Sequence, residues 1–231
     1  MTYNYPRFKN SYYDLASFEG PGRGEQMPDL VLTDLDGTPV RLSDLWDRRL
    51  VIETGSVTCP MYAKGVSVMN RMAEQHPDTR FIVLYVREAH PGERIGPHET
   101  LDQKREMAGR LAEVHGDGRA TLVDDIEGTA HKTLGSLPDM VYVLDPGGEV
   151  VFRGDWNDTD ALAEVLDAAA TDKQLGQEHF PPSKPSPPTA IKTLFVGGFK
   201  AVGDFVVSLP GLMALHRKAD IADQERSSDD S

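Results

Sequence analysis

The sequence predicts a three-layer α/β/α fold, in which helices cover both faces of one mixed sheet. Strand-like and helix-like patterns alternate through residues 27–175. Two runs rich in β-branched and aromatic residues, 50–54 and 81–86, are each followed by a stretch with helical spacing. The 231 residues suffice for one domain with extensions. Alternation of this kind favours parallel strands joined by covering helices.

The strongly patterned region begins with a hairpin and a strand–helix pair. Residues 27–41 form two short extended runs around an Asp-Gly dipeptide, which is typical of hairpin turns. A strand is predicted at 50–54 and a helix at 60–75, which a His-Pro dipeptide ends. The strand therefore delivers Cys59 to the start of a helix.

The second half of the domain repeats the alternation and closes with an antiparallel pair. A strand at 81–86 precedes a charged amphipathic helix at 99–114. An Asp-Pro-Gly-Gly run at 145–148 suits a tight turn between antiparallel strands. The other predicted elements are a strand at 120–123, a short helix at 128–134, strands at 140–144 and 150–152, and a helix at 158–170.

Composition divides the chain into a central domain and flanking segments. Residues 1–26 lack a clear period and are predicted to be an N-terminal arm before the domain at 27–175. Residues 181–189 hold five prolines and are expected to form an extended linker. Residues 190–218 are predicted to be an amphipathic helical segment that packs on its own domain, on a second subunit or on a membrane surface. Residues 219–231 are acidic and are expected to be disordered.

The charge balance and the cysteine count exclude several classes of function. The chain has 24 basic and 37 acidic residues, a formal net charge of -13, so nucleic acid is not an expected partner. No signal peptide and no long uncharged apolar run is present, which predicts a cytoplasmic protein without a transmembrane segment. One cysteine excludes an internal disulfide and a dithiol pair. Any redox chemistry therefore uses one thiol and an external reductant.

That cysteine, Cys59, occupies a position that favours reactivity. A lone cysteine is usually an inert buried side chain. Here the residue stands between a strand and a helix, where backbone N–H groups and the helix dipole lower a thiol pKa towards neutrality. Pro60 supports the placement, because proline is favoured in the first helical turn. The sequence predicts a nucleophilic thiolate.

Titratable residues follow the neighbouring strand at the same edge of the sheet. Glu88 and His90 lie just beyond the strand at 81–86, and Tyr85 comes three residues before Glu88. Ligand sites of α/β sheets gather at this edge, so we expect these groups to face Cys59 and to supply a proton. The spacing of Glu88, His90 and His98 would also suit a metal, but nothing else in the chain supports one, so no metal is expected.

Two motifs resemble those of a known family. Residues 27–59 resemble the opening of the thioredoxin-like redoxins. The run Gly55-Ser-Val-Thr-Cys-Pro60 resembles the active-site motif of the iodothyronine deiodinases, with Cys59 in the place of selenocysteine. The run Tyr85-Val-Arg-Glu-Ala-His-Pro91 resembles the strand-end motif whose tyrosine, glutamate and histidine face the chalcogen. The resemblance extends over roughly 27–170.

The resemblance implies a thioredoxin-like fold and a reductive dehalogenation of a small molecule. Cys59 would take the iodine as a sulfenyl iodide, and His90, oriented by Glu88, would protonate the ring carbon. An external thiol or redoxin would regenerate the cysteine, without a cofactor. The residues that the resemblance assigns to catalysis are Cys59, Glu88, His90, Thr58, Ser56 and Tyr85, and those it assigns to substrate binding are Pro60 and His98.

Two other functions remain open from the residues. A one-cysteine peroxidase would place a threonine and a distant arginine near the thiol, where this chain has Ser56 and Asp139. A redoxin fold could instead serve as a binding module, with the segment after Thr189 docking a partner. A homodimer through the domain or the C-terminal helix is also an expectation.

Overall fold

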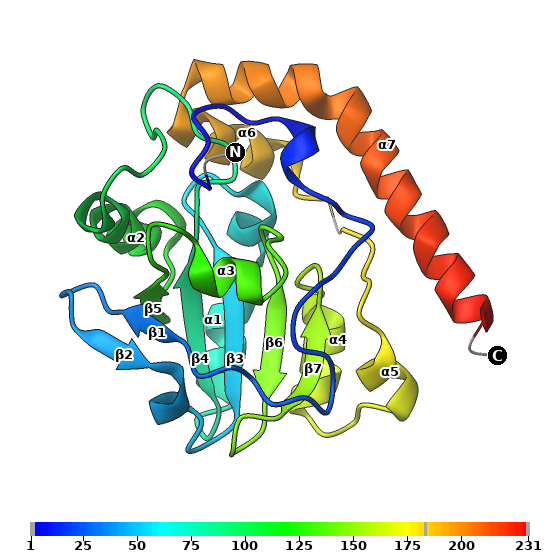
Figure 1. Cartoon of the computed structure of the whole chain (residues 1–231). Helices are drawn as coiled ribbons and strands as arrows, with labels where there is room; N and C mark the ends of the chain where they lie inside the picture. The colour runs from blue at the N-terminus through cyan, green and yellow to red at the C-terminus, as the bar shows by residue number, and fades with distance from the viewer. Residues whose placement is uncertain (1–2, 183, 230–231) are drawn as a thin grey trace.

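A seven-stranded mixed sheet forms the centre of the molecule (Figure 1). The computed structural model describes residues 3–182 and 184–229, with side chains described as far as residue 222. The strand order is β2-β1-β5-β4-β3-β6-β7. The strands are β1 (Val31–Thr33), β2 (Pro39–Arg41), β3 (Leu50–Gly55), β4 (Arg80–Tyr85), β5 (Ala120–Val123), β6 (Val141–Leu144) and β7 (Val150–Gly154).

The direction of the strands follows the lengths of their connections. β3, β4 and β5 are parallel, joined by the crossover helices α1 (Pro60–Gln75) and α2 (Leu101–His115), whereas β6 and β7 form an antiparallel hairpin. All six residues of β3 are buried, as expected for a central strand covered on both faces. The site therefore forms where β3 and β4 both end.

Helices cover both faces of the sheet, which confirms the predicted three-layer α/β/α class. On β4, Val83 and Tyr85 pack with residues of α1 and α2, while Ile82 and Leu84 belong to the core cluster that includes α3 (Thr129–Thr133). α3 and the N-terminal segment lie across one face, and α4 (Thr159–Leu166) lies on the face that α1 covers (Figure 1).

Local sequence signals explain where the two main helices begin and end. Pro60 starts α1, where its missing N–H costs no hydrogen bond. Thr100 caps α2 by accepting a hydrogen bond from the Gln103 N–H. Gly116 ends α2 in the left-handed region, at φ 72°, which a residue with a Cβ adopts at a cost.

Residues 3–26 are part of the folded body and do not stand apart as an arm. The guanidinium of Arg87 lies 4.9–5.1 Å from the ring centroids of Tyr3, Tyr5 and Tyr13. The hydroxyl of Tyr5 also donates to the carbonyl oxygen of Ala89, at 3.0 Å. Aromatic side chains without a helical or strand period are thus buried by contacts with the loop after β4. The buried apolar residues of this segment are Tyr5, Phe8, Tyr13 and Leu15.

The C-terminal segment contains two long helices in place of the single predicted one. α6 (Pro187–Gly197) packs on α1, and Gly198, at φ 110°, turns the chain into α7 (Phe199–Asp229). A further short helix, α5 (Asp172–Gly176), was not predicted. No helix in the described ranges is long and apolar enough to cross a membrane.

α7 continues past residue 218, which corrects the predicted disorder for 219–229. Ala219 is fully buried, and Asp220 lies 3.4 Å from the imidazole of His179. Composition could not reveal these contacts, because they join segments that are about 40 residues apart in sequence. Residues 230–231, and Ser183 in the predicted linker, lie outside the described residues.

Candidate active site

Cys59 lies at the predicted place, between the end of β3 and the start of α1. The backbone N–H groups of Met61 and Tyr62 interact with its sulfur and lower its pKa, as the helix N-terminus predicts. The side chain is only 1% exposed, however, and burial, followed by the charge of Asp139, raises the pKa well above the usual thiol value. Burial of Cys59 thus favours the neutral thiol, in opposition to the helix N-terminus, which favours the predicted thiolate.

A cavity of about 540 Å³ adjoins Cys59, and most of its lining is apolar. Pro60 and His90 both form part of the lining. A volume of this size suits a drug-sized ligand. The N-terminal segment contributes Phe8, Tyr13 and Leu15 to the lining, and α7 contributes Phe205, Leu209, Leu212, Met213 and His216.

Glu88 anchors the residue that precedes Cys59. Its buried carboxylate accepts hydrogen bonds from the Thr58 N–H at 2.9 Å, from the Thr58 hydroxyl at 2.5 Å and from the Tyr85 hydroxyl. Three donors on one carboxylate leave it little freedom to move. The structure thus brings three of the predicted residues, Thr58, Glu88 and Tyr85, into direct contact.

His90 presents a neutral imidazole to the cavity. Its backbone N–H donates to the Thr58 hydroxyl oxygen at 3.0 Å. Its ring contacts those of Phe8 and Phe205, with centroid distances of 4.3 and 5.4 Å. Burial lowers its pKa to about 3, and among the described residues its buried Nδ1 has no hydrogen-bond partner.

The predicted orientation of His90 by Glu88 needs correction. The described contacts connect the two residues only through the Thr58 hydroxyl and the main chain of His90. Ring contacts with Phe8 and Phe205 hold the imidazole instead.

Ser56 connects the two loops of the site, whereas His98 lies outside the cavity lining. The Ser56 hydroxyl oxygen accepts a hydrogen bond from the Ala89 N–H at 3.2 Å, which ties the loop after β3 to the loop after β4. His98 lies beside Glu88, with Nε2 3.7 Å from the carboxylate, and burial lowers its pKa. It is not among the residues that line the cavity, so its expected contact with substrate has no support in this geometry.

A buried polar network, which the sequence analysis missed, lies beneath the site. Arg119 pairs with Glu53 and with Asp117, the latter at 2.6 Å. The Tyr62 hydroxyl donates to Asp117, and burial raises the pKa of this phenol. The sequence did contain one sign of this network, because Glu53 is a charged residue within the otherwise uncharged strand β3. Burial and the neighbouring Glu53 also raise the pKa of Asp139, which favours its neutral form.

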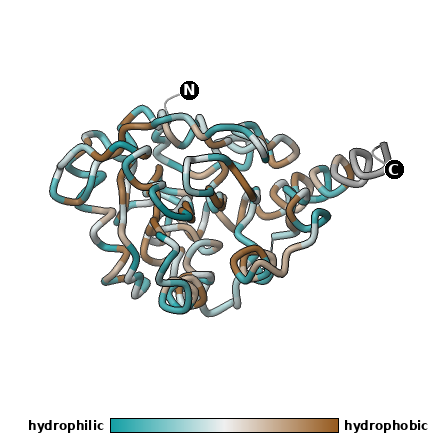
Figure 2. The backbone as a smooth tube through the Cα atoms, turned by 90° about the horizontal axis from the view of Figure 1, so that it is seen from below, coloured by the Kyte–Doolittle hydropathy of each residue, from teal (hydrophilic) through white to brown (hydrophobic). Residues whose placement is uncertain are grey.

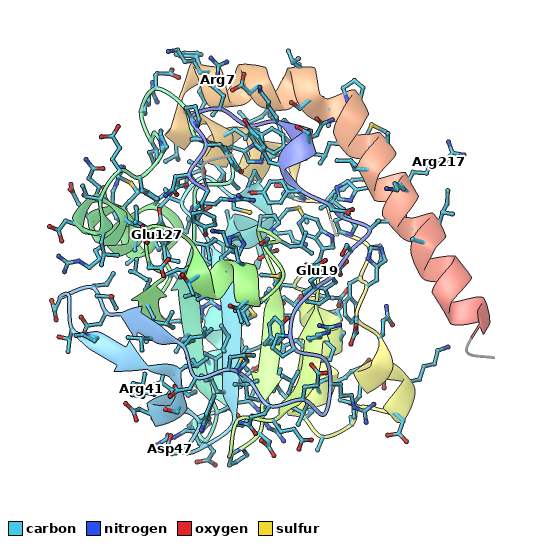
Figure 3. The ribbon with its side chains drawn as sticks, viewed as in Figure 1. Arg7, Glu19, Arg41, Asp47, Glu127 and Arg217 are labelled. Carbon is cyan, nitrogen blue, oxygen red and sulfur yellow. The ribbon has the colours of Figure 1, made fainter. Side chains whose placement is uncertain are left out.

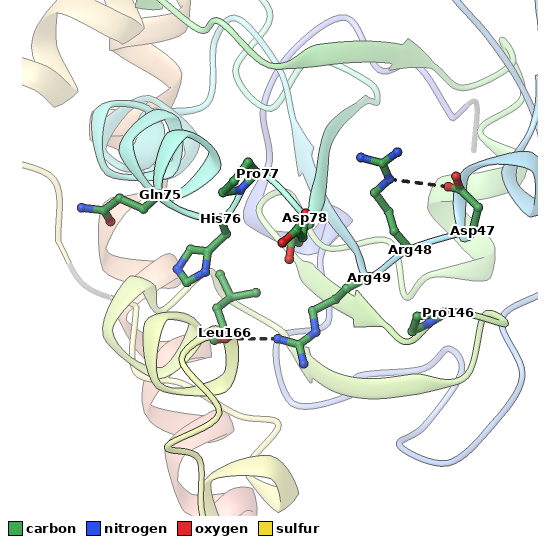
Figure 4. A pocket seen from close by; sticks show the side chains of 10 residues that line it. Asp47, Arg48, Arg49, Gln75, His76, Pro77, Asp78, Pro146 and Leu166 are labelled. Carbon is green, nitrogen blue, oxygen red and sulfur yellow. Dashed lines mark hydrogen bonds and ion pairs between the residues drawn. The ribbon is translucent and has the colours of Figure 1, made fainter.

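A second hollow, of about 530 Å³, lies at the opposite end of β3 from Cys59 (Figure 4). Polar and charged side chains form most of its lining, and Arg49 donates to the carbonyl oxygen of Leu166 at 3.1 Å. This second hollow is far from Cys59 and is therefore not part of the candidate active site. Within the described residues, no three His, Cys, Asp or Glu side chains are grouped to hold a metal ion.

The α/β/α layers, with one cysteine at a strand–helix junction, define a thioredoxin-like fold. Three solved structures share this fold at low identity. A candidate thiol:disulfide interchange protein DsbE from Chlorobium tepidum is 16% identical, with 68% of this chain and 100% of that one covered at a TM-score of 0.51. A candidate protein disulfide isomerase from Bacteroides thetaiotaomicron is 17% identical (70% and 95% covered, TM-score 0.51). A thiol peroxidase from Chromobacterium violaceum is 19% identical (67% and 92% covered, TM-score 0.50).

The family follows from the sequence match. Residues 7–165 match the family model described as iodothyronine deiodinase. The chain belongs to the iodothyronine deiodinase family.

Proposed function

We propose that the protein is a thiol-dependent reductive dehalogenase that removes iodine from an aromatic small molecule, with Cys59 as the nucleophile. One observation supports this most directly. The thiol of Cys59 and the neutral imidazole of His90 line the same apolar cavity. Such a cavity favours an aromatic ligand and excludes water that would compete for the proton.

The chemical step joins proton transfer to formation of the sulfur–iodine bond. The sulfur of Cys59 attacks the iodine while the thiol proton passes to Nδ1 of His90. The S–I bond forms, the C–I bond breaks, and its electron pair stays on the ring carbon, which takes the proton from His90. Burial favours the neutral form of both groups, so a free thiolate need not accumulate before substrate binds.

An external thiol completes the cycle. A first thiol attacks the sulfur of the sulfenyl iodide, releases iodide and leaves a mixed disulfide on Cys59. A second thiol attacks this disulfide, which restores the Cys59 thiol and releases the external disulfide. In sum, one C–I bond becomes C–H, two thiols become one disulfide, and hydrogen iodide is released.

The remaining predicted residues act by positioning. Glu88, held by Tyr85, fixes the loop that carries Cys59 through Thr58. Ser56 fixes the start of the loop that carries His90. Correct placement of two reacting groups contributes a large share of catalytic rate, so these contacts support turnover without touching substrate.

Iodide release tests the proposal. The purified protein receives an iodinated phenol and dithiothreitol, with Cys59→Ser, His90→Gln and the control His76→Gln, at the opposite end of the sheet, in parallel. We expect iodide from the wild type and His76→Gln, none from Cys59→Ser, and a rate about 10²-fold lower from His90→Gln. Equal release from Cys59→Ser would contradict the proposal.

Peroxide turnover is the parallel measurement. Consumption of peroxide without iodide release would support the one-cysteine peroxidase instead. Absence of both iodide release and peroxide turnover would support the alternative in which the fold serves as a binding module.

A further inference from the structure

The corner between α6 and α7 lies against the residues of the site. A Cβ on Gly197 would lie 2.7 Å from the carbonyl oxygen of His90 and 3.3 Å from Cγ2 of Thr58. Non-bonded heavy atoms pack best at about 3.5–4.0 Å, so these two neighbours leave no room for a side chain. The preceding residue, Val196, packs against the apolar cluster that contains Cys59. The main chain of the corner therefore approaches the peptide groups that carry the site.

The two adjacent glycines of the corner have different physical reasons. Gly198 ends α6 at φ 110°, in the left-handed region that favours glycine. Gly197 is still part of α6 and does not have a positive φ, so its backbone conformation would accept another residue. The end of α6 thus needs only one glycine. The close approach to His90 is what requires the second.

The loop after β4 fixes the corner in place. The N–H of Arg94 donates to the carbonyl oxygen of Gly197 at 3.1 Å, and its guanidinium donates to the carbonyl oxygen of Phe195 at 3.1 Å. Glu93 accepts the first N–H groups of α7. This loop also carries His90, so the same short segment holds both the imidazole and the corner.

The first half of α7 adds contacts next to the site. Ala201 is fully buried, and the ring of Phe205 contacts that of His90. Arg7 lies beside this half of the helix and pairs with Asp204 (Figure 3). The end of the helix projects beyond the body (Figure 2). The contacts that concern His90 therefore belong to the beginning of α7.

We propose that Gly197 is a positioning residue for His90 and Thr58, so that the corner between α6 and α7 is part of the active site. The main chain of His90 is held on two sides: the Thr58 hydroxyl oxygen accepts its N–H, and its carbonyl oxygen lies against Gly197. This main chain determines where the imidazole enters the cavity. Both helices lie outside residues 7–165, which match the family model. The effect on turnover rests on the proposed function, whereas the position of the imidazole does not.

Gly197→Ala and the matched control Gly203→Ala test the proposal in the full chain. Gly203 is a glycine of α7, and no described atom outside its own helical neighbourhood would lie within 4 Å of a Cβ on it. The first measurement is the proton NMR signal of the His90 imidazole, identified by its absence from His90→Gln. We expect this signal to move in Gly197→Ala alone, and the pKa of His90 to rise from about 3, because a displaced ring is less buried.

Steady-state iodide release is the second measurement. We expect kcat of Gly197→Ala to fall about tenfold with a smaller change in KM, because misplaced reacting groups lose rate more than affinity. Gly203→Ala should keep the wild-type rate. Arg94→Ala is the second variant if melting curves show Gly197→Ala to be unfolded, because it releases the carbonyl oxygen of Phe195 without adding an atom. It should move the same His90 signal by a smaller amount.

An unchanged His90 signal in folded Gly197→Ala, or in Arg94→Ala where Gly197→Ala does not fold, would overturn the proposal. Equal movement of the signal in Gly203→Ala would also overturn it, because that substitution has no contact with the site. A signal that moves only in Gly197→Ala, while the wild type releases no iodide, would contradict the proposed dehalogenation but support the positioning of His90 by the corner.

Discussion

Thr58 connects the two halves of the site. Its hydroxyl donates to Glu88 and accepts the His90 N–H, while its own N–H donates to the same carboxylate. No other described side chain joins the loop before Cys59 to both Glu88 and His90 in this way. The position of the reacting groups relative to each other therefore depends on a residue that is not itself a reacting group.

We expect Thr58→Val to lower kcat for iodide release by about 10²-fold with a smaller change in KM, because misplaced reacting groups lose rate more than affinity. Thr58→Ser keeps the hydroxyl and should stay within about threefold of the wild type. Steady-state kinetics on both variants, at a temperature where melting curves show them folded, provides the measurement. A Thr58→Ser variant as slow as Thr58→Val would remove the hydroxyl from the argument.

His90 should make the protein less stable in acid. Burial lowers its pKa to about 3 from 6.5, so between these pH values the unfolded chain binds a proton that the folded protein does not. The free energy of unfolding should therefore fall as pH falls below about 6.5, by about 1.4 kcal/mol per pH unit for this residue. His131, whose pKa burial also lowers to about 3, adds a similar slope.

Urea unfolding of the wild type and His90→Asn between pH 7.5 and pH 5 isolates the contribution of His90. The difference in unfolding free energy between the two proteins should shift in favour of the variant as the pH falls, because titration of the other groups cancels. Parallel pH profiles would show that the imidazole is not buried in the neutral form.

The start of α7 is held by a loop that belongs to the site. Glu93 accepts the N–H groups of Phe199 and Lys200 at 2.6 and 2.9 Å. Gly92 approaches α6 so closely that a Cβ on it would lie 2.3 Å from the carbonyl oxygen of Gly197. The loop after β4 thus joins the site to the helix that closes the cavity.

Removal of this cap should uncover the thiol. In Glu93→Ala, α7 loses the acceptor for two of its first N–H groups, and we expect the rate of Cys59 alkylation by iodoacetamide to rise about fivefold. The exposed Glu99→Ala variant is the control and should alkylate at the wild-type rate. A rate in Glu93→Ala equal to that of Glu99→Ala would show that α7 does not limit access to the cavity.

Buried charge beneath the sheet edge connects distant parts of the whole molecule. Arg119 follows α2, Glu53 lies on β3, and Asn157 after β7 also donates to Glu53. Each group is buried, so each depends on the others to replace water.

We expect Arg119→Met to lower the free energy of unfolding by about 3–5 kcal/mol, because it leaves two carboxylates buried without their cation. Arg41, whose side chain is 60% exposed, makes a surface pair with Asp29, and Arg41→Met should cost less than about 1 kcal/mol. Denaturant unfolding of both variants compares them. Equal losses would mean that the buried network contributes no more than a surface pair.

Local signals in the sequence were enough for the elements that position the thiol. β-Branched runs marked β3 and β4, and Pro60 marked the start of α1. The edge of the sheet to which Cys59, Glu88 and His90 belong follows from parallel connection, which is a local property of strand–helix–strand units. The resemblance to the deiodinases rested on these same residues.

The state of the thiol was decided only in three dimensions. Whether Cys59 is ionised depends on its burial, and the cavity beside it is lined by Phe8, Tyr13 and the inner side of α7, which come from opposite ends of the chain. The first 13 residues include five aromatic residues, which indicate that this segment is buried. They do not indicate where on the domain it packs. The sequence alone determined which groups meet at the edge of the sheet. The tertiary structure decided their protonation, because desolvation is a property of the assembled surroundings and not of any local run of residues.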